Sequence, residues 1–280
     1  IIGAGSAGCV LATRLSEDHK RSILLLEAGP DYPDFEHLPD DLKLGNNVYF
    51  SAYGPHNWGF TARVTPDQPA LQIPRGKAMG GSSAVNGQVF YRGIPDDYDD
   101  WAAMGNDEWA FTDVLPYFRK METDRDFGGD FHGSDGPIPI KRDSREQWEP
   151  HSKAFYQACM DAGFPEDADQ NHPESEGVGP RPRNSVEGVR ISMAMAYLDL
   201  ARHRLNLTIK ANAAARRIIF EGDRAVGVEV EGSGEIFVAE GDEIILSSGS
   251  VVSPHLLLLS GVGSADHLRE MGIPVVPDLP

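Results

Sequence analysis

Apolar residues follow a distinct pattern at the start of the chain. Ile1-Ile2 and the continuous apolar run 23–26 are typical of buried parallel strands, and the small and apolar residues of 7–15 predict a helix between them. Residues 30–75 carry many prolines and little periodicity, so we expect a long excursion with extended pieces. The chain therefore opens as strand, turn, helix and strand, followed by an irregular segment.

The middle of the chain changes to a helical pattern. Apolar spacing predicts helices at 114–122, 152–162 and 192–202, and a stretch rich in Gly, Asp and Pro, 128–139, separates the first two. Residues 96–202 therefore form a separate layer in our prediction.

Alternating and β-branched residues then predict strands. The expected strands are 207–209, 217–220, 225–230 and 235–238, and glycine-containing turns separate the last three. This spacing indicates a β-meander.

A further apolar run, 243–246, predicts one more buried strand, which ends at Gly249. We expect the next helix to begin at Pro254 with Ser253 as its N-cap, and to end at Gly261. Its leucines at 256, 257 and 259 would cover the core.

Composition narrows the class of protein. With 280 residues, 40% of them hydrophobic, the chain is long enough for a sizeable core. A formal net charge of −18 would repel a phosphate backbone, so no nucleic-acid partner is expected. The only two cysteines are Cys9, in the predicted first helix, and Cys159, which argues against a disulfide framework and fits a reducing compartment.

Targeting signals are not evident in the sequence. No apolar run is long enough to span a bilayer, and no signal-peptide pattern is seen. We expect a cytoplasmic protein, with a peripheral membrane association left open. Because the chain starts within a strand and stops at Pro280 in a loop-like stretch, we also expect a fragment.

A glycine motif supplies the first chemical signal. Gly3, Gly5 and Gly8 form G-x-G-x-x-G between the first strand and helix, where the helix N-terminus favours a pyrophosphate. Glu27 follows about 20 residues later, at a strand end, as expected of a carboxylate that binds the adenosine ribose and disfavours NADP. The motif alone does not separate FAD from NAD, and a glycine turn without a ligand is the alternative. The continuation to Gly29 resembles flavoproteins.

Two longer segments carry a family resemblance. Residues 75–87, with Phe90, Gly93 and Asp99 at the expected offsets, resemble the first signature of the glucose–methanol–choline oxidoreductases, although Met79 departs from its usual residues. Residues 249–263 are similar to the second signature. Choline dehydrogenases are the most similar members that we can suggest.

This resemblance implies an α/β fold with a Rossmann-like FAD-binding domain that carries the β-meander. That domain would comprise 1–95 and 203–280, and 96–202 would be part of an incomplete substrate-binding domain. The residues implied to bind the cofactor are Gly3, Gly5, Ser6, Ala7, Gly8, Glu27, Ala28, Ala78, Gly80, Gly81, Ser82, Asn86, Gly87, Gln88, Val89, Ala215, Ser248 and Gly249.

The implied cofactor is FAD, held non-covalently. Some family members attach the flavin to a histidine directly before the signature asparagine, and Val85 occupies that position here. Trp58 falls in a lid-like region, where it would shield the flavin or serve as a packed core residue.

The implied activity is FAD-dependent oxidation of the CH–OH group of a choline-like or other primary alcohol, with hydride transfer to flavin N5. Oxygen, a quinone or a carrier protein would accept the electrons. The family's catalytic histidine and its partner are expected beyond Pro280, so no catalytic residue is assigned and this chain alone should be inactive. The alternatives are a flavin-containing lyase, a non-catalytic flavin-binding protein and a nicotinamide dehydrogenase.

The remaining polar residues suggest no second site. None of the nine histidines forms a metal-binding pattern, so no metal is expected. His132 and His172 are predicted to be surface residues of polar loops, and His255 to be structural. The acidic pairs 96–97 and 99–100 indicate a solvated face or the start of a helix.

Overall fold

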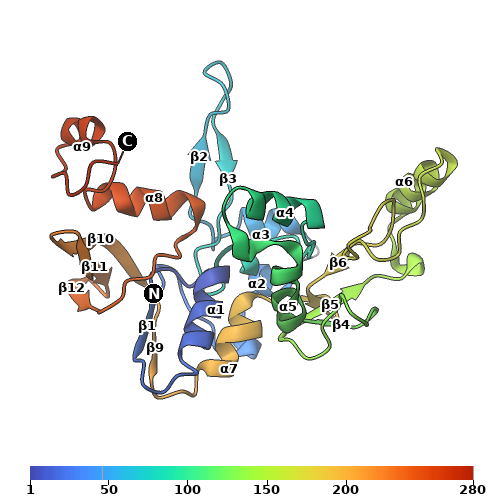
Figure 1. The fold of residues 1–280 in the computed structure, drawn as a ribbon, viewed down its shortest axis with the longest axis horizontal. Helices are drawn as coiled ribbons and strands as arrows, with labels where there is room; N and C mark the ends of the chain where they lie inside the picture. Colours follow the sequence, from blue (N-terminus) through green and yellow to red (C-terminus); the bar gives the residue numbers. More distant parts are fainter. Residues whose placement is uncertain (46, 280) are drawn as a thin grey trace. The chain divides into compact units, whose positions relative to one another are not determined.

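The computed structural model describes residues 1–45 and 47–279, and the chain divides into two compact units (Figure 1). Unit 1 comprises Ile1–Asn86 and Ser192–Pro280, and unit 2 comprises Gly87–Ile191. The borders of these units lie about ten residues from the expected domain borders, and the FAD-binding and substrate-binding roles of the domains remain predictions.

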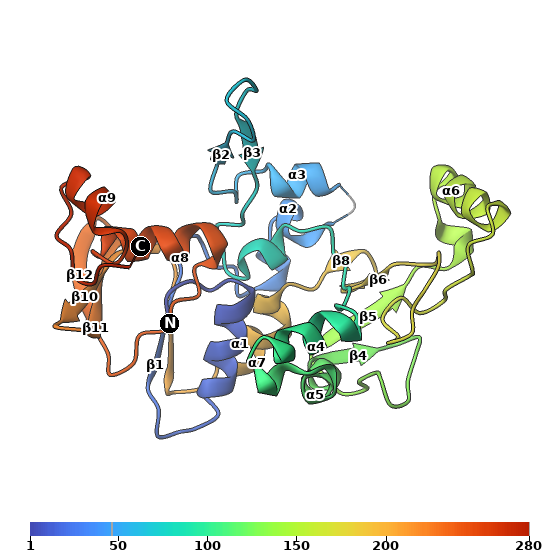
Figure 2. The same ribbon diagram turned by 45° about the horizontal axis from the view of Figure 1, so that its top comes forward.

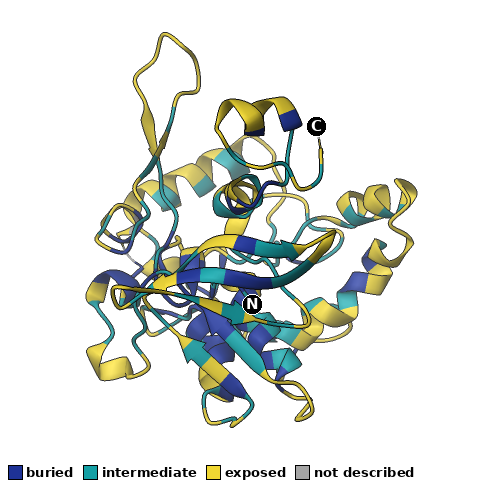
Figure 3. Ribbon diagram, turned by 90° about the vertical axis from the view of Figure 1, so that its left-hand side faces the viewer, coloured by how far each residue is buried: buried dark blue, intermediate teal, exposed yellow. Residues whose placement is uncertain are grey.

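A small parallel sheet lies at the centre of unit 1. β1 (Ile23–Leu26) pairs in parallel with β9 (Leu207–Lys210), and Ile2 forms parallel bridges to both Leu26 and Leu246. Leu26 is buried, as a continuous apolar run between two neighbouring strands should be. Figure 3 shows the buried positions along the strands near the amino terminus. The predicted strand at 23–26 is therefore confirmed, whereas Ile2 pairs through isolated bridges and is not part of a strand.

The expected strand at 243–246 is wrong in its extent. Only Leu246 forms a bridge, and the backbone bonds around it are Ile2 N–H to the Ile245 carbonyl and Ser247 N–H to the Ile2 carbonyl.

Helices cover this sheet. α1 (Ser6–Leu15) buries Cys9 and Ala12, small residues that allow close contact, and it packs on the π-helical turn Ala194–Leu198. That turn continues into α7 (Asp199–Ala201), so the helix expected at 192–202 is present but is wider in its first turn.

The predicted meander is confirmed. Its strands are β10 (Ala213–Glu221), β11 (Arg224–Gly232) and β12 (Glu235–Glu240), joined in antiparallel order. α8 (Gly249–Leu259) lies beside the meander and is followed by α9 (Ala265–Glu270) (Figure 2). Buried Leu256 of α8 packs against residues of β10.

The expected start of α8 is wrong. The helix begins at Gly249, not at Pro254, and Pro254 lies inside it. Only two residues separate the bridge at Leu246 from the helix, and Gly249, with φ +80°, permits the sharp change of direction. Gly261 ends the helix with φ +86°, as expected, whereas Leu259 is 41% exposed and does not cover the core.

The excursion between β1 and the second glycine-rich segment contains short elements that the sequence did not predict individually. Its hairpin is exposed along most of its length and projects from the rest of unit 1 (Figures 1 and 2). The elements are η1 (Phe35–His37), α2 (Asp40–Lys43), α3 (Val48–Ala52), β2 (Phe60–Ala62) and β3 (Leu71–Ile73). The next element, η2 (Gly81–Ala84), lies within the second glycine-rich segment.

Unit 2 combines helices with a small mixed sheet in which β5 lies between β4 and β6. Both predicted helices, α5 and α6, are confirmed, and α4 is an additional helix. The elements are α4 (Pro95–Ala103), η3 (Asp107–Trp109), α5 (Phe111–Met121), β4 (Glu122–Asp124), β5 (Ile138–Arg142), η4 (Arg145–Gln147), α6 (Pro150–Asp161), β6 (Pro182–Arg183), β7 (Ser185–Val186) and β8 (Val189–Arg190).

The acidic pairs lie in α4, and one residue of each pair accepts a hydrogen bond at the start of a helix. Asp97 accepts a hydrogen bond from Ile94 N–H at 3.0 Å, and Asp99 accepts one from Phe111 N–H at 2.9 Å, at the start of α5. Their interpretation as helix-start charges is confirmed.

Across residues 1–45 and 47–279, every helix falls short of the length and apolarity that crossing a membrane requires.

Candidate functional site

The main cavity of unit 1 has a volume of about 520 Å³, within the range of about 300–1,000 Å³ that small-molecule sites occupy. Its walls come from five parts of unit 1: the first glycine turn, the end of β1, the segments around Trp58 and Gly81, the start of β10, and the start of α8. Most lining residues are Gly, Ala or Ser, so the cavity presents backbone rather than long side chains.

Gly5 and Gly8 have opposite surroundings in the first turn. A β-carbon added at Gly8 would lie 1.9 Å from the Gly3 carbonyl oxygen, so no side chain fits there. At Gly5, the nearest atom to an added β-carbon would be the Ser247 carbonyl oxygen at 4.0 Å. Gly8 is therefore needed for packing, whereas Gly5 keeps an open space at the cavity wall.

Two helix N-termini reach the same cavity. Ser6 and Ala7, at the start of α1, line it together with Ser248, Gly249 and Ser250, at the start of α8. The first N–H groups of a helix lack partners within the helix, and the N-terminal end of its dipole is positive. The cavity is therefore suited to an anionic group.

Serine hydroxyls fix the backbone beside these helix ends. Ser247 Oγ donates to either of two carbonyl oxygens, of Ile2 at 3.0 Å or of Gly3 at 2.8 Å, and Ser248 Oγ lies 3.0 Å from the Ile2 carbonyl. These contacts hold the start of α8 against the first glycine turn.

Glu27 is a buried carboxylate at the end of β1. Oε2 accepts a hydrogen bond from Ala4 N–H and Oε1 accepts one from Gly29 N–H, each at 2.9 Å. Burial raises the pKa of Glu27, and the N–H donors of Gly29 and Ala4 oppose that rise. Each oxygen retains capacity for a second donor, such as a ribose hydroxyl.

Aromatic residues form another wall. Trp58 and Phe60 line the cavity and stack with ring centroids 5.5 Å apart, and Lys77 Nζ lies 4.8 Å from the centre of the Trp58 ring. Contacts with Phe60 and Lys77 thus fix the position of the Trp58 ring, which also faces the cavity. This arrangement is suited to covering a planar ligand.

The cavity brings together eleven of the eighteen predicted cofactor-binding residues: Gly3, Gly5, Ser6, Ala7, Glu27, Ala28, Gly81, Ser82, Ala215, Ser248 and Gly249. Gly8, Ala78, Gly80 and Asn86 belong to unit 1 but do not line it, and Gly87, Gln88 and Val89 belong to unit 2. The binding roles of all these residues stay predictions.

Sequence reasoning missed several lining residues. Ala213 and Ala214 precede Ala215, and a run of small residues beside a predicted one was a usable signal. Arg75 is the first residue of the signature segment 75–87 but was not among the predicted cofactor-binding residues, and Phe60 had no signal because it lies in the excursion that lacks periodicity.

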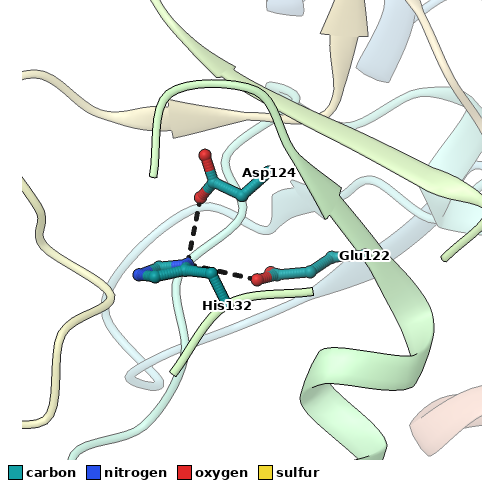
Figure 4. Close-up of side chains that lie close together, drawn as sticks. All are labelled: Glu122, Asp124 and His132. Atoms are coloured by element: carbon teal, nitrogen blue, oxygen red, sulfur yellow. Dashed lines mark hydrogen bonds and ion pairs between the residues drawn. The ribbon is translucent and has the colours of Figure 1, made fainter. Parts of the chain in front are cut away.

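Unit 2 contains a buried network of charged side chains (Figure 4). His132 Nδ1 lies 3.2 Å from oxygens of both Glu122 and Asp124, and Nε2 lies 2.7 Å from Asp169. Arg142 pairs with Asp124 at 2.9 Å and with Asp169 at 2.8 Å. The expectation of a surface residue at position 132 is wrong, because His132 is only 4% exposed.

The charges of this network balance. Burial alone lowers the pKa of His132, but hydrogen bonds to Asp124, Asp169 and Glu122 outweigh it and raise the pKa to about 10. Burial alone would raise the pKa of Asp124, yet its bonds to His132, Asp126 N–H and Arg142 lower it to about 2. His132 is therefore an imidazolium at neutral pH.

Glu122, Asp124 and His132 also place one ligand atom each within 4.8 Å of one another, a spacing that a metal ion could use. However, both ring nitrogens of His132 face carboxylates, and Arg142 already neutralises Asp124. A metal ion would have to displace a proton and a guanidinium, so the geometry favours an ion-pair network.

The chain matches known proteins along its length. A family model described as GMC oxidoreductase matches residues 1–278. The oxygen-dependent choline dehydrogenase of Chromohalobacter salexigens is 45% identical over 289 aligned residues, which cover 100% of this chain and 50% of the dehydrogenase. The chain spans about half the length of the curated relatives it matches.

Solved structures match the whole fold. Pyridoxine 4-oxidase from Mesorbium loti aligns with a TM-score of 0.93 at 32% identity, covering 100% of this chain and 54% of that one. An FAD-dependent oxidoreductase from Chaetomium thermophilum aligns with a TM-score of 0.88 at 28% identity, covering 100% and 50%. These matches confirm the predicted α/β class.

Proposed function

Because the chain belongs to the GMC oxidoreductases, the family whose model matches residues 1–278, we propose that it binds FAD in the glycine-lined cavity of unit 1. In this proposal the protein oxidises the CH–OH group of a small primary alcohol. The similarity to a choline dehydrogenase favours a choline-like substrate.

The open space at Gly5 is the observation that carries the proposal. It lies at the start of α1, among backbone N–H groups, where a pyrophosphate is stabilised by hydrogen bonds and the helix dipole. Glu27 would accept hydrogen bonds from the adenosine ribose, and Ala215 would lie at the adenine. Gly81 and Ser82 would lie toward the flavin, with Trp58 covering it.

When bound, FAD would supply the hydride acceptor at N5. The described residues would bind and orient the cofactor and exclude water from it. We assign no catalytic base within them, because proton removal from the alcohol is expected of a histidine outside this chain. Oxygen, a quinone or a carrier protein would receive the electrons.

Replacing Gly5 and Gly8 by alanine tests the proposal. Gly5→Ala should weaken FAD binding at least about tenfold, equivalent to about 1.4 kcal/mol, with an unchanged melting temperature, because its methyl group fills ligand space only. Gly8→Ala should fail to fold, because its β-carbon overlaps the Gly3 carbonyl. Binding would be followed by quenching of flavin fluorescence. Wild-type FAD affinity in folded Gly5→Ala would contradict the site.

The attachment of FAD has its own test. Val85, which is buried, offers no nucleophile where some family members form a covalent bond. Acid precipitation of the flavin-loaded protein should therefore release all yellow colour into the filtrate. Colour that stays with the precipitated chain would disprove non-covalent binding.

The same preparation tests the alternative of a nicotinamide dehydrogenase. A purified protein that shows no visible flavin absorbance but binds NAD would support that alternative.

A further inference from the structure

Unit 1 holds a chain of three hydrogen-bonded side chains outside the cavity. Tyr32 Oη lies 2.8 Å from His56 Nε2, and His56 Nδ1 lies 2.7 Å from Asp41 Oδ2. Asp41 is 4% exposed and His56 is 8% exposed. A carboxylate beside Nδ1 keeps a proton on that nitrogen and thereby orients the ring, so that Nε2 faces the Tyr32 hydroxyl.

These side chains close a ring of hydrogen bonds around the second glycine-rich segment. Met79 N–H donates to the Pro30 carbonyl at 3.0 Å, and Lys77 N–H donates to the His56 carbonyl at 2.8 Å. Tyr32 follows Pro30 by two residues, so its bond to His56 joins the two strips of chain that hold residues 77–79. We call Tyr32, His56 and Asp41 the clasp.

The clasp is connected to the cavity wall through adjacent backbone. Asn57 forms a bridge to Gly76, and Trp58 N–H donates to the Arg75 carbonyl at 3.0 Å. Trp58, Arg75 and Gly76 line the cavity. A shift of His56 would therefore move the wall that carries Trp58 directly. The Gly5 and Glu27 wall is held by hydrogen bonds from Ala4 N–H and Gly29 N–H to Glu27, and it meets the clasped segment where Gly80 N–H donates to the Ala4 carbonyl.

We propose that Asp41, His56 and Tyr32 are positioning residues that set the distance between the Trp58 wall and the bound flavin. The inference rests on the proposed FAD site. The hydroxyl of Tyr32 is the part of the clasp that joins the two strips, while the ring of Tyr32 packs with Leu42, Ala78, Ala84 and Val85. Removing the hydroxyl leaves that packing in place.

The test compares FAD with ADP as probes, because ADP lacks the flavin. Tyr32→Phe should bind FAD about five- to tenfold more weakly, bind ADP with unchanged affinity, and alter the visible absorption band of the bound flavin. Asp41→Asn should have the same pattern, because an amide does not hold the proton on Nδ1 in the same way. Tyr49→Phe, at a 73% exposed tyrosine of α3, is the matched control and should behave like wild type.

Each other outcome has a defined meaning. Equal losses of FAD and ADP affinity with a lower melting temperature would reduce the clasp to a structural role and overturn the proposal. Unchanged FAD affinity and spectrum in Tyr32→Phe would also overturn it, and so would an unfolded Tyr32→Phe chain, since the hydroxyl would then determine folding. A wild-type protein that binds neither FAD nor ADP would instead refute the proposed function.

Discussion

The cavity of unit 1 and the charged network of unit 2 place polar groups in the interior by opposite means. The cavity is built from backbone and small residues, and Glu27 and Arg75 are the only charged side chains among its described lining residues. The network contains three carboxylates and three cations that pair with one another: Glu122, Asp124, Asp169, Arg92, Arg142 and His132.

The difference shows that a cluster of buried charge is not by itself a binding site. In the network, each carboxylate already has a cation beside it, so a ligand would have to replace an existing partner. In the cavity, the N–H groups at the starts of α1 and α8 have no partner within their helices. A bound anion would supply the missing acceptors there.

Removal of Arg142 should have the largest effect and would sharpen the contrast. Arg142→Met leaves Asp124 and Asp169 buried without their guanidinium, which should lower the free energy of unfolding of unit 2 by about 3–5 kcal/mol. Chemical denaturation measures this loss. In Arg145→Met, where an exposed pair with Glu166 is lost, the change should be about 0–1 kcal/mol. Equal losses of unfolding free energy in the two variants would show that the buried network stabilises unit 2 no more than an exposed ion pair does.

Replacement of Glu27 should have a smaller effect, on ligand binding in unit 1. Glu27→Ala should weaken the binding of both FAD and ADP by about 1.5–3 kcal/mol. Both ligands carry the ribose whose hydrogen bonds to the carboxylate are lost. The variant should also be less stable, since Ala4 N–H and Gly29 N–H lose a buried acceptor. Titration by calorimetry measures the affinity, and an unchanged FAD affinity would remove Glu27 from the site.

The pH dependence of unit 2 should be the smallest effect near neutrality. The pKa of His132 is raised from 6.5 to about 10, so its contribution to stability is complete below pH 6.5 and is lost as pH rises through about 10. The denaturant concentration at the unfolding midpoint should therefore decrease as the pH is raised from 7 to 10. The decrease should be smaller in His132→Gln. His151→Gln, at an exposed position of α6, is the control. The same pH slope in wild type and His132→Gln would contradict the charged state.

Sequence alone predicted those elements of unit 1 whose structure is determined by residues close together in the sequence. β1 is found at 23–26 because four consecutive apolar residues suit a strand buried between two others. The meander was predictable because glycine turns separate its strands. α4 was not predicted as a helix, because its acidic residues obscure the apolar spacing, and the start of α8 was misplaced because proline usually occupies a first helical turn.

Long-range arrangements were beyond the reach of the sequence. The partners of His132 lie at 122, 124 and 169, and nothing in Asp130-Phe131-His132-Gly133 signals burial. The clasp similarly joins Tyr32, Asp41 and His56 across an irregular excursion. The glycine turn and Glu27 were found because their spacing carries a known physical requirement, and a hydrogen-bond network formed by tertiary folding has no such spacing.

The pairing of β1 with β9 has a consequence for how the chain is made. Ile23 pairs with Leu207, so about 180 residues separate the two strands. At a synthesis rate of about 5–20 residues per second, β1 leaves the ribosome roughly 9–36 seconds before its partner. Its leucines lack this partner throughout that interval, while the whole of Gly87–Ile191 is completed. Unit 2 has buried apolar side chains of its own, such as Ile138 and Ile140, and is complete before β9 is made. A nascent chain stalled before residue 207 is therefore the state in which chaperone binding and aggregation of β1 should be greatest.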